Sequence, residues 1–439
     1  MLGQVGERFG KADLLKIFSG SAFIFGCRIV GAGVAFITQV LMARWMGADE
    51  LGVYVLAFSW LTILAVFSVA GLNGAAMRFI GDPLAQDDFA SIRGFLRRSR
   101  QIALILSVLI GSVCALLVQQ GYIGDAEHKI VFYIALSALP IFTVVVLNNG
   151  IANAFSWFSI SFLPNNVIRP TLFLIAVAVV WYTRQELSAA TAMALHWVAI
   201  VFIAILVVTL GERAIAREVP AAVSTYDSRL WLRTSLPIMM MILFNSYFPA
   251  FTVIVAGAML SNADIAVYNI GFRIALLVAF GLHAIDSYAA PDIMRLHSKG
   301  ETRELKQLID RITRMRFLVA LGSVVVFVLL GRWILGFFGE EFTAGYWVLV
   351  ILGLTQLVQA AVGPVARLLS MTGHQDQGFY ISTVSLAIAG VLILLLTPPF
   401  GVVGTAVAAL LAITVWSIWM SYIVATRLGL RPALISFGS

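Results

Sequence analysis

Long runs of apolar residues, broken by short polar segments, recur along the whole chain. The first run covers residues 20–40 and contains one charged side chain, that of Arg28. As a helix at roughly 1.5 Å per residue, a run of this length crosses a bilayer core of about 30 Å. Twelve such runs occur, and we predict a membrane-spanning helix for each. They are centred near residues 30, 64, 108, 144, 176, 203, 253, 278, 325, 354, 391 and 412.

The composition supports a polytopic membrane protein. Of the 439 residues, 61% are hydrophobic and 12% are charged, and the mean hydropathy is +0.96. Soluble domains carry about twice that share of charge. The first apolar run is too long for the core of a signal peptide, so we expect it to be retained. Cys27 and Cys114 both lie inside apolar runs, so neither a disulfide framework nor a cysteine metal site is expected, and we predict no cofactor.

Lysine and arginine residues are distributed unevenly between the two sides of the predicted membrane. Of the 29 basic residues, 21 lie at the termini and in alternate connections on one side, and four lie in the connections on the other side. The positive-inside rule therefore places both termini in the cytoplasm. This distribution explains the net charge of +7 without a nucleic-acid partner.

The two halves of the chain resemble each other at a constant offset of 214 residues. The segment "MGADELGVYVLAFSW", residues 46–60, aligns with "LSNADIAVYNIGFRI", residues 260–274, and the same offset pairs Arg97 with Arg311. Because each half contains an even number of predicted spans, both halves enter the membrane in the same sense. The axis that relates them then lies along the membrane normal.

We therefore predict an all-α polytopic membrane protein with about twelve transmembrane helices in two six-helix bundles, related by a pseudo-two-fold axis along the membrane normal. Residues 1–211 form the N-terminal bundle, residues 212–233 a cytoplasmic linker and residues 234–439 the C-terminal bundle. In transporters built from repeats, cargo binds between the halves and the halves rock about it. A central cavity is expected there.

Two basic segments precede the third and ninth predicted spans. In "DDFASIRGFLRRS" and "ETRELKQLIDRIT" the apolar residues recur at helical spacing. Short amphipathic helices on the membrane surface would produce this pattern, and ordinary basic cytoplasmic loops would account for the charge. The sequence leaves both interpretations open.

Two arginines inside the predicted spans are candidates for a cavity that binds cargo. Arg28 aligns with Ile242 and Arg273 aligns with Ser59, so the repeat does not keep either charge. A charge in the bilayer interior costs roughly 2.5 to 3.5 kcal/mol on insertion scales, so each needs a partner, a water-filled cavity or a ligand. The alternative for each is an ion pair or snorkelling to the interface.

For several other polar residues in the spans, a structural role explains the residue at least as well as a functional role does. Asp286 and His283 lie one helical turn apart and are the candidates for ion coupling, although Asp286 also fits a solvated interfacial carboxylate. His196 fits a hydrogen-bonded packing residue. Arg169 and Arg367 are placed near cytoplasmic helix ends, where snorkelling suffices.

Several asparagines also lie within predicted spans. Some must join helices, since an unpaired amide in lipid is costly, and others could bind sugar hydroxyls. Two separated cations with few acids favour an anionic cargo such as a diphosphate, for which arginine offers bidentate donors. A cationic drug would favour buried acids and aromatic faces. The amides considered are Asn73, Asn148, Asn149, Asn245 and Asn269, and those retained as substrate-binding candidates are Asn73, Asn245 and Asn269.

No catalytic motif is found. The chain contains no nucleophile elbow, P-loop, HExxH, GxGxxG or Cys/His cluster in a supporting context, and no pore loop typical of a channel. We therefore predict a protein that is not an enzyme, with a membrane-bound glycan-processing enzyme as a remaining alternative.

Three segments carry a family resemblance: "ARWMGADELGVYVLAFS" (residues 43–59), "AAMRFIG" (75–81) and "TPPFGVVGTAVAALLA" (397–412). They resemble bacterial polysaccharide-biosynthesis flippases of the multidrug/oligosaccharidyl-lipid/polysaccharide exporter superfamily, and in weaker form the resemblance covers nearly the whole chain. It implies that Arg28 faces a diphosphate or sugar. It also implies that Arg44 and Arg78 occupy basic motif positions, with a motif or gating role.

The resemblance implies a flippase that moves an undecaprenyl-diphosphate-linked oligosaccharide from the cytoplasmic to the periplasmic leaflet by alternating access. Its partners would be this substrate, membrane lipid and other glycan-assembly membrane proteins, in the bacterial cytoplasmic (inner) membrane. A cation-coupled drug exporter of the same superfamily is the alternative, although the chain lacks the intramembrane acid cluster of many such exporters. A major-facilitator transporter shares the six-plus-six plan, but its basic loop signature between the second and third spans is absent from "GDPLAQDDFASIRGFLRRS".

Overall fold

The computed structural model describes residues 11–124, 128–299, 301–365 and 375–428, and in these residues every regular element is a helix. The first half contains α1 (Lys11–Val69), α2 (Leu72–Leu84), α3 (Phe89–Gln120), α4 (Lys129–Ala154), α5 (Phe158–Leu163), the π-helical turn η2 (Pro164–Ile168), α6 (Arg169–Arg184) and α7 (Ala189–Glu218). The second half contains α8 (Ser228–Ala256), α9 (Asn262–Lys299), α10 (Thr302–Gly336), the 3₁₀ turn η3 (Glu340–Gly345), α11 (Tyr346–Ala361) and α13 (Gln375–Leu428).

Ten apolar helical stretches in the described residues are long enough to cross a membrane, and two of them are long enough to cross twice. The stretch Phe23–Leu84 has 62 residues and the stretch Gln377–Thr426 has 50. Each is bent at a glycine with positive φ, Gly47 (74°) in α1 and Gly401 (57°) in α13. Glycine tolerates this conformation because it has no Cβ. The described residues therefore make about twelve crossings, which confirms the prediction from the apolar runs.

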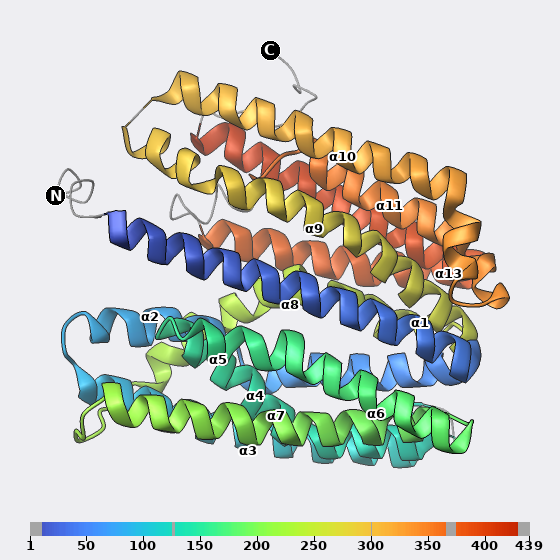
Figure 1. The fold of residues 1–439 in the computed structure, drawn as a ribbon, viewed down its shortest axis with the longest axis horizontal. Helices are drawn as coiled ribbons and strands as arrows, with labels where there is room; N and C mark the ends of the chain where they lie inside the picture. The colour runs from blue at the N-terminus through green and yellow to red at the C-terminus, as the bar shows by residue number, and fades with distance from the viewer. Residues whose placement is uncertain (1–10, 125–127, 300, 366–374, 429–439) are drawn as a thin grey trace.

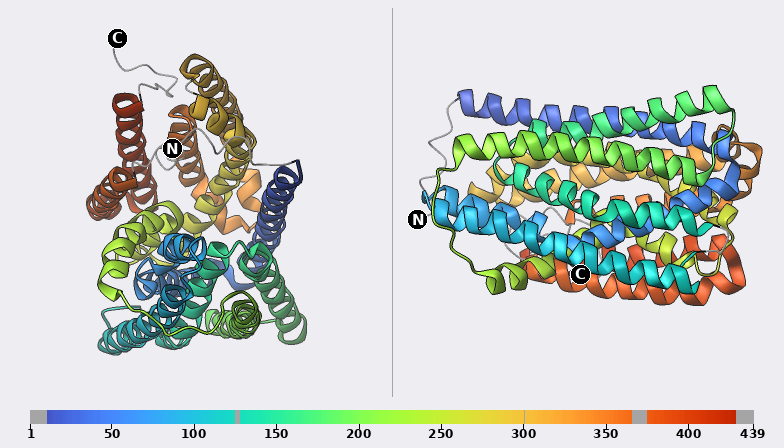
Figure 2. Two further views of the ribbon diagram at one scale, coloured as in Figure 1. Left: turned by 90° about the vertical axis from the view of Figure 1, so that its left-hand side faces the viewer. Right: turned by 90° about the horizontal axis from the view of Figure 1, so that it is seen from below.

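The helices form two groups, with α1 and α8 between them (Figure 1). The helices α2 to α7 lie on one side, and α9, α10, α11 and α13 lie on the other. The first half of α1 runs alongside α9, while its second half packs among α3, α4 and α7. The left view of Figure 2 shows the same separation, with α1 at the edge of the seam. A two-lobed membrane protein of this kind confirms the predicted fold class.

The connection between the two halves is shorter than the predicted linker. Helix α7 continues to Glu218 and α8 begins at Ser228, so only residues 219–227 are not helical. This segment is bound to α3: Arg93 donates hydrogen bonds to the carbonyls of Val219 (2.8 Å) and Pro220 (2.7 Å). The domain limits 1–211, 212–233 and 234–439 stay a prediction.

The two basic segments that precede the third and ninth predicted spans are neither loops nor separate surface helices. They form the first turns of the long helices α3 and α10, in which Ile92 and Leu96, and Leu305 and Ile312, are buried in the protein core. Their apolar faces pack against other helices rather than against lipid headgroups. Helical periodicity was visible in the sequence, but the partner that covers the apolar face was not.

Candidate functional site

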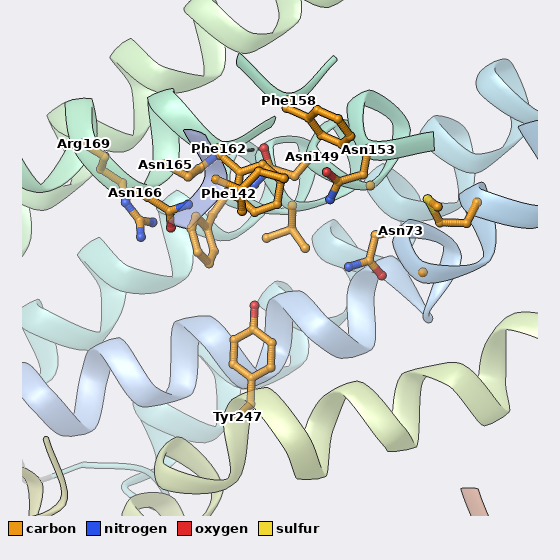
Figure 3. Close-up of a pocket in the computed structure, with 15 residues that line it drawn as sticks. Asn73, Phe142, Asn149, Asn153, Phe158, Phe162, Asn165, Asn166, Arg169 and Tyr247 are labelled. Atoms are coloured by element: carbon orange, nitrogen blue, oxygen red, sulfur yellow. Dashed lines mark hydrogen bonds between the residues drawn. The ribbon is translucent and has the colours of Figure 1, made fainter. Parts of the chain in front are cut away.

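A cavity of about 600 Å³ lies at the seam between the two groups of helices. We call it the central cavity. Its lining contains an unusual number of amides and comes from α1, α2, α4, α5, η2, α6 and α8 (Figure 3). The polar lining residues are Asn73, Asn149, Asn153, Asn165, Asn166, Arg169 and Tyr247. The hydroxyl of Tyr247 on α8 points across the cavity toward the amides on the opposite wall.

The π-helical turn η2 supplies two of these side chains, and Arg169, the first residue of α6, follows directly. Pro164 begins the turn and Pro170 lies two residues after its end, and neither has the amide N–H that a regular α-helix needs at each position. A π turn holds one extra residue, and such turns occur frequently at functional sites. Asn165, Asn166 and Arg169 consequently line the same cavity, and Asn165 donates a hydrogen bond to the side chain of Asn149 (2.9 Å).

Arg169 is the cation at the centre of the site. It lies eleven residues after Phe158, roughly 16 Å along the span, and it lines three cavities. Its guanidinium lies 5.5 Å from the centre of the Phe142 ring, and its buried Nη1 atom has no hydrogen-bond partner. The interpretation of Arg169 as a snorkelling residue at a helix end is therefore wrong. Its distance from both ends of the apolar run was the signal that could have identified it.

Arg28 lines a second cavity of about 450 Å³, which we call the Arg28 cavity. The two cavities share Asn165, Asn166 and Arg169. The Arg28 side chain is exposed, and its guanidinium lies 5.5 Å from the centre of the Phe162 ring. We call the central cavity and the Arg28 cavity together the chamber. Arg28 and Arg169 both line it, although only Arg28 was predicted from the sequence to do so.

Arg273 belongs to a smaller cavity of about 130 Å³, which Arg169 also lines. Asn269 holds this region together because its side-chain oxygen accepts hydrogen bonds from Arg273 on α9 (3.1 Å) and from Gln39 on α1 (3.2 Å). His196 also lines this cavity, where its Nδ1 atom bonds to the Tyr54 hydroxyl (2.6 Å). The structure thus brings Arg273 and Asn269 into direct contact, with Asn269 in a bridging position.

The two candidates for ion coupling lie in different surroundings. Asp286 is buried on α9 and forms an ion pair with Arg316 on α10, and it lines none of the cavities described here. The position of Arg316 inside a helix was missed from the sequence, where it was counted with the basic loop. His283 lines the Arg28 cavity and a fourth cavity beside it.

The remaining candidates are spread over the molecule. Asn73 lines the central cavity and Asn245 lines the fourth cavity. Arg44, near the bend of α1, donates a hydrogen bond to the Phe337 carbonyl after α10 (2.7 Å). Arg78 is exposed on α2, and Asn148 accepts a hydrogen bond from Arg100 (3.3 Å). The cavities do not include Arg44 or Arg78, and Arg367 lies outside the described residues.

The electrostatics of the chamber favour anions. Among the described residues, no ion pair joins Arg28, Arg169 or Arg273 to a carboxylate. Arginine binds phosphate and carboxylate groups through several parallel hydrogen bonds. No cluster of three or more His, Cys, Asp or Glu side chains that could hold a metal ion occurs in the part of the chain that the structure describes. The arrangement can therefore bind an anion.

The fold is that of multi-pass membrane transporters with two lobes. The lipid II flippase MurJ in an inward closed conformation superimposes with a TM-score of 0.70 at 13% identity, covering 92% of this chain and 87% of that one. An inward-facing multidrug resistance MATE family transporter of the MOP superfamily superimposes with a TM-score of 0.69 at 13% identity, covering 92% and 98%. At this identity the likeness shows the fold alone.

The chain belongs to the polysaccharide biosynthesis protein family, whose model matches residues 17–297. One relative of this chain is the probable low-salt glycan biosynthesis flippase Agl15 of Haloferax volcanii. It is 23% identical over 408 residues, which cover 91% of this chain and 82% of Agl15. The probable flippase AglR of the same organism is 27% identical over 168 residues, covering 38% of this chain and 35% of AglR.

Proposed function

We propose that this protein is a flippase that moves an undecaprenyl-diphosphate-linked oligosaccharide from the cytoplasmic to the periplasmic leaflet. The observation that carries the proposal is the set of three arginines, Arg28, Arg169 and Arg273, that line connected cavities without a carboxylate partner in the described residues. Family membership and the glycan flippases among its relatives support a lipid-linked glycan as cargo.

The polar head of the cargo would enter the chamber at the seam while its lipid tail stays in the bilayer. The diphosphate would be bound by the guanidiniums of Arg28 and Arg169, and the amides of the central cavity would bind hydroxyls close to it. Rocking of the two lobes would then expose the chamber to the other side of the membrane.

Replacement of Arg28 or Arg169 by alanine tests this function. A hydrogen bond to a charged group contributes about 1.5 to 3 kcal/mol. The transport rate of each variant should therefore be about tenfold or more below that of the wild type. Transport is measured in proteoliposomes as the appearance of a fluorescent polyprenyl-diphosphate oligosaccharide in the opposite leaflet.

The matched control is Arg332→Ala. Arg332 also lies over an aromatic ring, 5.4 Å from the centre of Tyr346, but it lines none of the cavities. Its replacement should leave transport unchanged. Full transport by Arg28→Ala and Arg169→Ala, at wild-type protein levels, would show that these arginines do not bind the diphosphate.

A cation-coupled drug exporter is the second candidate, because the fold is shared with MATE family transporters. Such an exporter would change the efflux of cationic dyes and leave lipid-linked glycan unaffected. Coupling to an ion, in either case, would use Asp286 or His283. Loss of the gene with unchanged glycan and altered dye efflux would favour this candidate.

We further propose that the protein lies in the bacterial inner membrane with both termini in the cytoplasm, alongside other glycan-assembly proteins. The apolar helices of the described residues support a location in a membrane, and the excess of basic residues at the termini and in alternate connections supports this orientation. Protease protection of a C-terminal tag in sealed vesicles tests it.

A further inference from the structure

A fourth cavity of about 150 Å³ lies among helices α8, α9, α11 and α13, in the second half of the molecule. We call it the neutral cavity. None of its lining residues is an arginine, lysine, aspartate or glutamate. Its lining instead combines amides with aromatic rings, principally Asn245, Gln356 and Gln359 with Phe244, Phe248 and Trp416. Its chemistry therefore differs from that of the cationic chamber.

Two of its lining side chains carry buried polar atoms without a hydrogen-bond partner. Gln356 is 3% exposed and its Oε1 atom accepts no hydrogen bond, and Trp416 is 7% exposed and its Nε1 atom donates none. Buried polar atoms in folded proteins are nearly always paired, so an unpaired acceptor and an unpaired donor at one cavity need an explanation. One partner that both donates and accepts would satisfy the two.

The aromatic side chains form flat walls beside these atoms. The rings of Phe244 and Trp416 are stacked with their centres 5.3 Å apart, and the ring of Phe248 lies 5.3 Å from that of Phe244. A sugar ring presents C–H bonds on its faces and hydroxyl groups, each a donor and an acceptor, at its rim. The neutral cavity, at about 150 Å³, has the volume of about five water molecules at roughly 30 Å³ each. This volume suits one sugar ring better than several linked sugars.

The neutral cavity adjoins the cationic chamber. Leu276, Ala279 and His283 of α9 line both the neutral cavity and the Arg28 cavity. A ligand with a charged part and a neutral part can therefore occupy both at once. A lipid tail would leave the two polar atoms unpaired, and a free anion would find no arginine or lysine among the lining residues.

We propose that the neutral cavity binds one sugar ring of the cargo, so that the second lobe recognises the glycan while Arg28 and Arg169 hold the diphosphate. This inference rests on the proposed function. Sugar hydroxyls would donate to Gln356 and accept from Trp416, and the ring would lie against Phe244 and Trp416. Sites that pair buried polar groups with a substrate hydroxyl discriminate strongly against ligands that lack it.

The test compares two probes with purified protein by native mass spectrometry. One probe is undecaprenyl diphosphate without sugar, and the other is the lipid-linked oligosaccharide extracted from the membranes of the source cells. In Gln356→Met and Trp416→Phe, affinity for the extracted oligosaccharide should fall about tenfold, and affinity for the sugar-free lipid should stay within twofold. In Arg28→Ala, both affinities should fall.

Matched controls are available in the same protein. Gln377 and Trp197 also carry a buried polar atom without a partner, Oε1 and Nε1, but neither residue lines any of the four cavities. Gln377→Met and Trp197→Phe should bind both probes as the wild type does. Gln356→Met keeps nearly the same shape and removes the unpaired oxygen together with one long hydrogen bond, from Nε2 to the Thr355 hydroxyl (3.4 Å). Its thermal stability should therefore not fall, whereas a purely structural role predicts a loss.

The outcomes separate the inference from the function on which it rests. Equal losses for both probes in Gln356→Met and Trp416→Phe, or no loss in either, would overturn the sugar site and leave the flippase intact. Failure of the wild type to bind either probe would instead overturn the proposed function.

Discussion

Arg28, Arg169 and Arg273 each carry a charge in an apolar span, and no described carboxylate forms an ion pair with any of them. Insertion scales put the cost of such a charge at roughly 2.5 to 3.5 kcal/mol. Contacts with aromatic rings at Phe162 and Phe142 offset only part of this cost. Arg169 joins the cavity lined by Arg28 to the one lined by Arg273, and a ligand that supplies the missing negative charge best explains residues that lower stability and line such adjoining cavities.

Asp286 and Arg316 form the opposite case, a buried cation with its partner present. Removing one member of a buried pair costs about 3 to 5 kcal/mol, because the other charge is left uncompensated. We therefore expect Asp286→Asn to be strongly destabilised in thermal unfolding. The double variant Asp286→Leu with Arg316→Met should regain most of that stability.

Transport by the double variant then tests ion coupling at Asp286. If the pair is purely structural, transport returns together with stability. If the carboxylate binds the coupling ion, transport stays lost although the protein is stable. A double variant as unstable as Asp286→Asn would contradict the pairing itself.

Some members of the site could be predicted from single residues, and others could not. Arg28 stands out because it is the one charge in its apolar run, and the repeat places Ile242 at the equivalent position. Arg169 was misplaced because Pro170 and the preceding asparagines resemble a helix end, whereas the chain continues through a π turn. Gln356 and Trp416 gave no signal, since only the fold brings α11 and α13 to one cavity.

The contact between α1 and the π turn η2 sets the geometry of the chamber. Gly31 of α1 lies so close to Asn166 that an added Cβ would come within 1.9 Å of the Asn166 carbonyl oxygen. Both residues line the Arg28 cavity. The spacing of Arg28 and Arg169 across that cavity therefore depends on the absence of a side chain at position 31.

Gly31→Ala should push α1 away from η2. Overpacking of this kind costs about 1 to 3 kcal/mol, so we expect a lower thermal stability together with weaker transport. Gly26 and Gly33 on the same helix have no neighbour within 4 Å of an added Cβ, so Gly26→Ala and Gly33→Ala serve as controls. These should be neutral or more stable by up to about 1 kcal/mol, because alanine favours the helix. Equal effects at all three positions would show that the contact does not matter.

The overall architecture could be predicted because length and hydropathy determine how often an apolar helix crosses a membrane. Packing could not, because lipid and protein interior select the same side chains. On α10, Leu329 is 73% exposed and Leu335 is fully buried, yet both are leucines in one apolar run. The two-lobed arrangement followed from the repeat at an offset of 214 residues, whereas the position of α1 between the lobes did not.

Opening of the molecule at the bend of α1 requires contacts between the two groups of helices to break. Arg44 joins α1, which lies between the groups, to the second group, with its Nε atom 2.7 Å from the Phe337 carbonyl. We expect Arg44→Ala to increase the population of molecules in which the two groups of helices are farther apart at the end near Arg44 and Phe337. Spin labels at Thr183 and Ala344, in a cysteine-free background, should report longer distances in this variant. Arg332→Ala is the control, since Arg332 on α10 contacts Tyr346 within the second group of helices. An unchanged distance distribution in Arg44→Ala would exclude a gating role for the contact with Phe337.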